Sequence, residues 1–82
     1  RNKNKIDIIK YYTILENMLG EANLYEIERI STELRNSIEN ENEIKSILLK
    51  LIMSSRENDL QKTTEILSKL KKIINEMEMI KL

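Results

Sequence analysis

The sequence predicts an all-α protein, a compact antiparallel bundle of four helices. Isoleucine and leucine recur at steps of three and four residues along most of the 82-residue chain, which is the spacing of one helix face. Proline is absent and glycine occurs once, so little interrupts the helices. Short polar segments separate four such stretches. We expect helices at approximately 4–19, 24–39, 43–54 and 59–80, in a single domain over 1–82 that is a fragment of a longer protein.

The first joint follows a helix with a broad apolar face. Gly20 is expected to end that helix, because glycine adopts the left-handed conformation of a helix terminus without steric penalty. Asn23, followed three residues later by Glu26, has the form of a capping box. The second helix is therefore expected to begin at about Leu24.

The other two joints are polar as well. Residues 39–43 contain no apolar side chain, which predicts a loop before the third helix. Ser54 and Ser55 are interpreted as the exit of the third helix, and Asn58 or Asp59 as the cap of the fourth. The fourth stretch is apolar on two sides. Because the joints are only four or five residues long, neighbouring helices should run antiparallel.

Composition excludes most catalytic and metal chemistry. Histidine and cysteine are absent, so zinc sites, thiol nucleophiles and histidine acid–base pairs are excluded, and Ser54 and Ser55 lack a base. The acidic cluster of Glu39, Glu41 and Glu43 lacks the spacing and the glycine of a calcium loop, and is interpreted as a solvated turn. We expect no enzymatic activity, no metal and no cofactor.

Charge and hydropathy argue against two classes of partner, nucleic acid and membranes. The formal net charge is zero, so no overall field attracts nucleic acid or an anionic membrane. Lys69, Lys71 and Lys72 lack the stacking aromatics and the wider basic stripe of a nucleic-acid site. No apolar run reaches the length of a membrane span, and no signal peptide is recognised. We expect an intracellular protein that binds neither nucleic acid nor membrane.

Two groups of residues suggest contacts with other chains. Flexible methionines line adaptable binding surfaces as well as irregular cores, which draws attention to Met53, Met77 and Met79. The two-sided fourth helix offers a second possibility, pairing between copies of the chain. Its candidate oligomer face consists of Leu60, Leu67, Leu70 and Ile74.

Two stretches resemble a known family. Residues 27–38, IERISTELRNSI, and 61–73, QKTTEILSKLKKI, are similar to two runs of the integrase-binding domains in the family built on the N-terminal domain of the elongation factor TFIIS. The resemblance implies a non-enzymatic helical bundle whose inter-helix loops capture short, disordered, acidic and hydrophobic peptides of transcription and chromatin proteins. It implies that Glu41 accepts hydrogen bonds from partner amides, beside Asn40, and that Met77 and Met79 belong to a second binding loop. It also implies a nuclear location, where the composition alone allows the cytoplasm.

The expected function follows from these observations. We expect a non-catalytic interaction domain that binds a peptide or helix of another protein, with Asn40, Glu41, Met77 and Met79 as the contact residues. The alternative is an oligomerisation or scaffold segment that pairs through its last helix.

Overall fold

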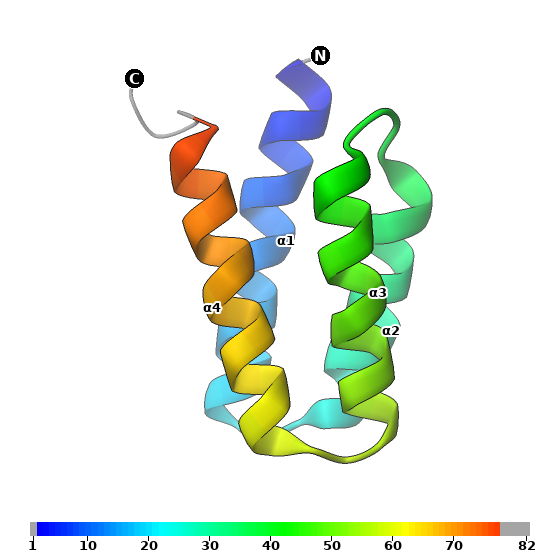
Figure 1. Cartoon of the computed structure of the whole chain (residues 1–82), viewed down its shortest axis with the longest axis vertical. Helices are drawn as coiled ribbons and strands as arrows, with labels where there is room; N and C mark the ends of the chain where they lie inside the picture. Colours follow the sequence, from blue (N-terminus) through cyan, green and yellow to red (C-terminus); the bar gives the residue numbers. More distant parts are fainter. Residues whose placement is uncertain (1, 78–82) are drawn as a thin grey trace.

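The predicted bundle of four helices is confirmed. The computed structural model describes the backbone of residues 2–77 and the side chains of residues 7–77. Four helices follow one another, α1 (Asn2–Gly20), α2 (Leu24–Ser37), α3 (Asn42–Arg56) and α4 (Leu60–Glu76), and the described residues contain no strand. They run alternately down and up, so that each is antiparallel to its neighbours in sequence (Figure 1). The bundle is elongated, with principal extents of 34 × 22 × 17 Å.

The four helices are not packed equally. The contact between α2 and α3 is the most extensive, followed by those of α3 with α4 and of α1 with α2, whereas the contact between α1 and α4 is much smaller. The loop between α2 and α3 lies at the same end of the bundle as the start of α1 and the end of α4 (Figure 1). The turns from α1 to α2 and from α3 to α4 lie at the opposite end.

All four helices contribute to one apolar core. Burying a leucine or isoleucine side chain contributes about 1.5–3 kcal/mol relative to leaving it exposed, so this core is the main source of stability. The fully enclosed apolar side chains come from every helix and include Ile8, Leu15, Ile27, Leu34, Ile44, Leu48, Leu51, Leu67 and Leu70. The apolar rows in the sequence therefore face inwards, as their helical spacing predicts.

The turn between α1 and α2 differs from the prediction in one respect. Asn23 caps α2 as expected, its side chain accepting a hydrogen bond of 3.2 Å from the backbone N–H of Glu26. The helix ends at Gly20 as predicted, but the predicted left-handed conformation of Gly20 is wrong, because this last helical residue has no positive φ. Ala22 takes the left-handed position instead, with φ of 54°. The Ala22 amide donates to Leu19 and the Asn23 amide to Met18, which is the hydrogen-bond pattern of a Schellman motif.

The ends of α2 and α3 need larger corrections. Helix α2 ends at Ser37 and not at residue 39, because Ile38 is extended and turns its buried side chain into the core. Helix α3 starts at Asn42 and continues to Arg56, two residues beyond the predicted end. Ser54 and Ser55 are buried inside this helix and both donate hydrogen bonds to the carbonyl of Leu51, at 3.1 and 2.7 Å. They are part of the helix and not its exit.

The start of α4 agrees with the sequence. Asp59 is the N-cap, and its carboxylate accepts a 3.0 Å hydrogen bond from the backbone N–H of Lys62. Asn58 does not cap α4 but takes the left-handed position in the turn after α3, with φ of 61°. Helix α4 ends at Glu76, with Met77 as its C-cap, earlier than the predicted end at residue 80. Residues 78–82 lie outside the described part of the chain.

None of the described helices combines the length with the apolar character that a bilayer span requires.

Candidate partner-binding surfaces

The residues implied by the family resemblance lie at one end of the bundle. Asn40 is exposed in the loop between α2 and α3, with a left-handed φ of 66°. Glu41 follows as the N-cap of α3, where its carbonyl accepts from the amide of Lys45 at 2.9 Å and its carboxylate makes no capping bond. Met77 lies at the end of α4 and packs partly buried against the core. Met79 lies outside the described residues. The loop and the end of α4 share one end of the molecule (Figure 1).

The predicted oligomer face is divided by the fold. Leu67 is 2% exposed, Leu70 is 0% exposed and Ile74 is 5% exposed, because all three face the core of their own bundle. Leu60 is 44% exposed, at the first turn of α4. Three of the four residues of this face are therefore occupied inside their own bundle, and only Leu60 lies at the surface. One apolar helix face suits an internal core and an oligomer seam equally well.

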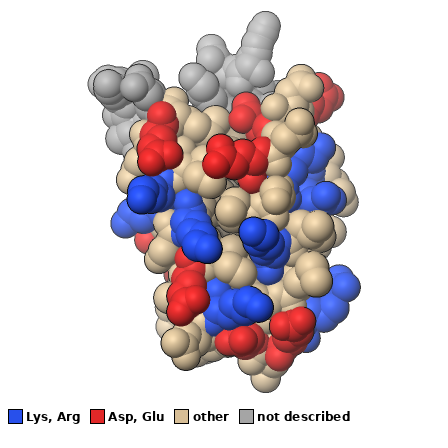
Figure 2. Space-filling view, in the orientation of Figure 1, with Lys and Arg blue, Asp and Glu red and all other residues tan. Residues whose placement is uncertain are grey.

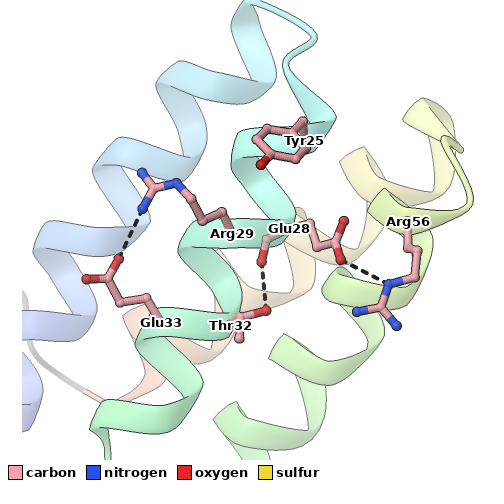
Figure 3. A pocket seen from close by; sticks show the side chains of 6 residues that line it. All are labelled: Tyr25, Glu28, Arg29, Thr32, Glu33 and Arg56. Carbon is pink, nitrogen blue, oxygen red and sulfur yellow. Dashed lines mark hydrogen bonds and ion pairs between the residues drawn. The ribbon is translucent and has the colours of Figure 1, made fainter.

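A hollow in the surface lies on the outer side of α2 and has a volume of about 560 Å³. Tyr25 lies at one end of it and is the most exposed large apolar side chain that the structure describes, at 75% (Figure 3). Arg56 reaches across from α3, and its Nε lies 2.9 Å from the carboxylate of Glu28 on α2. This pair joins the outer edges of two helices.

The charges in this hollow neutralise one another. Arg29 lies between two glutamates of its own helix, 2.7 Å from Glu26 and 3.6 Å from Glu33. The hydrogen bond to Glu26 is the main cause that raises the pKa of Arg29. Because both arginines already face carboxylates, the hollow has little charge to offer a ligand. Its remaining attraction is the ring of Tyr25.

A second hollow lies in the groove between α3 and α4 and has a volume of about 360 Å³. Its apolar floor is formed by Met53, which is 51% exposed, and by Ile66, which is 6% exposed. Lysines and glutamates from both helices surround this floor. The charged lining consists of Lys50, Glu57, Lys62, Glu65 and Lys69.

The charges of the groove differ from those on α2 in one important way. None of the three groove lysines is within ion-pair distance of a carboxylate in the part of the chain that the structure describes. Basic side chains gather across the middle of the face formed by α3 and α4, with acidic side chains mostly towards its two ends (Figure 2). The groove therefore combines an apolar floor with cations that are free to bind.

The two serines and the acidic cluster considered for catalytic and metal chemistry can be placed in the structure. The hydroxyl of Ser54 donates to the Leu51 carbonyl and lies 2.8 Å from the hydroxyl of Thr63, so two buried neighbours already occupy it. Within the described residues no group of three acidic side chains is placed to hold a metal ion. The cluster of Glu39, Glu41 and Glu43 does not form such a group.

The sequence contained a partial signal for these surfaces. Met53 was a candidate because methionine adapts to binding partners, and it indeed lies exposed in a groove. Tyr25, Leu49 and the groove lysines gave no recognisable motif. Each lies outside the apolar face that its helix turns towards the core. An apolar residue outside that face can indicate a binding surface.

Comparison with known proteins identifies no relative of this chain. No protein-family model, no curated protein and no solved structure matches this chain.

Proposed function

We propose that this chain is a non-catalytic interaction domain that binds a peptide or helix of another protein. The observation that carries the proposal is the groove between α3 and α4, which Met53 lines together with Ile66 while staying half exposed. Apolar side chains in concave, solvent-exposed positions are typical of protein-binding sites. The bundle can bury its core without Met53, so its exposure is not required by the fold.

The position of Leu49 supports the same surface. Leu49 is 43% exposed and lies four residues before Met53, so the two side chains occupy one edge of α3. Two exposed apolar residues at this spacing form a ridge that another helix can pack against. The resemblance to the TFIIS N-terminal-domain family adds disordered segments of transcription and chromatin proteins as one class of partner.

A photoreactive amino acid tests the proposal directly. The group is placed at Met53 in one sample and at exposed Thr13 on α1 in the control, and both are irradiated in an extract of the source cells. We expect adducts specific to position 53, followed by binding of the purified partner that Met53→Glu weakens at least about tenfold. Because Met53 is half exposed, this variant should keep its helical circular dichroism. Equal adducts from both positions, or undiminished binding by Met53→Glu, would reject the proposal.

The end of the bundle provides a second candidate surface for the same function. The carboxylate of Glu41 has no capping role, and the loop that carries it lies at the same end as Met77. A partner held at this end should lose affinity with Glu41→Ala or Met77→Ala and keep it with Met53→Glu. We expect the opposite pattern, because Met77 is partly buried whereas Met53 lies in a hollow. Titrating all three variants with one purified partner decides between the surfaces.

A further inference from the structure

We infer that the groove between α3 and α4 is a docking site for an acidic, amphipathic helix of a partner protein. This inference rests on the proposed function and specifies the chemistry of the partner. Three features of the groove support it: its shape, the order of charges along it and the absence of competing internal ion pairs.

The shape of the groove favours a helix. It runs between two antiparallel helices whose register is fixed by the contact of Ser54 with Thr63, 2.8 Å between hydroxyl oxygens. Met53 and Ile66 form an apolar strip in this groove, and Leu49 lies one turn further along α3. A helix lying along such a groove places apolar residues at steps of three and four onto the strip. Its remaining faces then meet the charged walls.

The charges of the walls favour an acidic partner. Lys50 on α3 and Lys69 on α4 both lie beyond the Ser54–Thr63 contact, on the side away from the turn that joins the two helices. This half of the groove carries one lysine on each wall and one carboxylate, that of Glu65 on α4, so its lysines outnumber its carboxylates. The half nearer the turn is mixed, with Glu57 opposite Lys62. A partner helix with carboxylates beside its apolar face at the basic end would complement this order.

The groove lysines are available for such a contact. The three ion pairs among the described side chains all involve Arg29 or Arg56, at the outer face of α2. A partner carboxylate would therefore not have to displace an internal one. Glu57 and Glu65, which also line the groove, disfavour a continuous polyanion such as nucleic acid. A second copy of this chain fits less well, because the α2 glutamates Glu26, Glu28 and Glu33 already face arginines.

Two synthetic helices can test the inference with the whole chain. The first has about 15 residues, or four turns, with leucines along one face and glutamates on both sides of them, and the second has lysines in place of the glutamates. Fluorescence anisotropy measures their binding, with a single-stranded oligonucleotide as a third probe. We expect the glutamate helix to bind and the lysine helix and oligonucleotide not to bind.

Charge reversals locate the site of binding. Lys69→Glu should weaken binding of the glutamate helix about fivefold, and Lys50→Glu together with Lys69→Glu about tenfold or more. Lys71→Glu is the matched control, because it makes the same charge change on the same helix but lies at the hollow between α1 and α4. It should change the affinity less than twofold, about the scatter of a distant surface charge.

The outcomes separate this inference from the proposed function. Equal binding of the two helices, tighter binding of the oligonucleotide, self-association that blocks the groove, or equal effects of Lys69→Glu and Lys71→Glu would each overturn the acidic-helix inference. The proposed function would survive any of these results if the adducts from position 53 stay specific and Met53→Glu weakens the purified partner. Loss of that specificity rejects the function itself.

Discussion

Ala22 occupies a backbone conformation that costs an L-residue about 1 kcal/mol or more, because its Cβ approaches the following carbonyl. Its φ of 54° closes the Schellman motif at the end of α1. Gly20, two residues earlier, is helical and gains nothing from its conformational freedom. Glycine would therefore be favoured at position 22, and alanine would be favoured at position 20.

This arrangement predicts two stabilising substitutions. Ala22→Gly relieves the left-handed strain, and Gly20→Ala adds a Cβ that meets no other atom within 4 Å while reducing the entropy of the unfolded chain. Each should raise the free energy of unfolding by about 0.5–1 kcal/mol in urea titrations. A destabilising Gly20→Ala would show that Gly20 adopts a conformation that alanine disfavours, contrary to its helical φ in the structure.

Tyr12 makes stability depend on alkaline pH. Burial, the hydrogen bond from its hydroxyl to Glu16 and the charge of Glu16 raise the pKa of Tyr12 from 10.0 to about 12. The folded state thus holds the phenolic proton more tightly than the unfolded chain does. This stabilisation is fully present below pH 10 and is lost as the pH rises from about 10 to about 12.

The corresponding variant is Tyr12→Phe, which keeps the ring and removes the ionisable hydroxyl. Urea unfolding at about pH 8 and about pH 11 should show a smaller loss of stability in the variant than in the parent chain. The parent should retain some loss that the variant shares, since burial also raises the pKa of Tyr11. The same decrease in both proteins would show that Tyr12 is not the group responsible.

At the scale of elements, a buried pair of hydroxyls joins α3 to α4. Ser54 donates to the carbonyl of Leu51, so the proton in its 2.8 Å contact with Thr63 comes from Thr63. Both side chains are buried, at 2% and 0% exposure. Removing the Ser54 hydroxyl would leave that of Thr63 without its partner.

The pair should therefore respond asymmetrically to mutation. Ser54→Ala should cost about 1–3 kcal/mol, whereas Thr63→Val, which leaves Ser54 bound to Leu51, should cost less. The double variant should cost less than the sum of the two, which a double-mutant cycle by thermal or urea unfolding measures. Strict additivity would mean that the two hydroxyls do not depend on each other.

Sequence patterns predicted the elements better than their ends. The four helices and the caps at Asn23 and Asp59 follow from local rules of spacing and hydrogen bonding, which do not depend on the rest of the fold. Ser54 and Ser55 were misread as an exit because serine favours helix ends in isolation, whereas here each bonds back to its own helix within the core. Ile38 is extended and lies outside the helix, yet its side chain is buried in the core. Helical periodicity cannot distinguish such a residue from one inside the helix.

The same limit applies to the candidate site. The helical periodicity identified the apolar face of α4. It could not show whether Leu67, Leu70 and Ile74 face their own bundle or another chain, because the same spacing suits burial in either place. The groove between α3 and α4 depends on how two helices meet. Only Met53 could be singled out beforehand, because methionine is common at binding surfaces.

At the scale of the whole molecule, the core accounts for the apolar faces of the four helices, which predicts a monomer. Sedimentation at micromolar concentration should give one species with the mass of a single chain at all concentrations. The exposed Leu60 is the one member of the predicted oligomer face that remains on the surface. A concentration-dependent dimer that Leu60→Glu abolishes would contradict the monomer and restore pairing through α4.

Binding of a partner helix in the groove between α3 and α4 can be mapped by NMR, through the shifts of backbone amides during titration with the glutamate helix. We expect shifts concentrated in residues 49–57 and 62–69, with the loop at 38–41 unchanged. Shifts confined to the loop and the end of α4, or no shifts at saturating peptide, would contradict it.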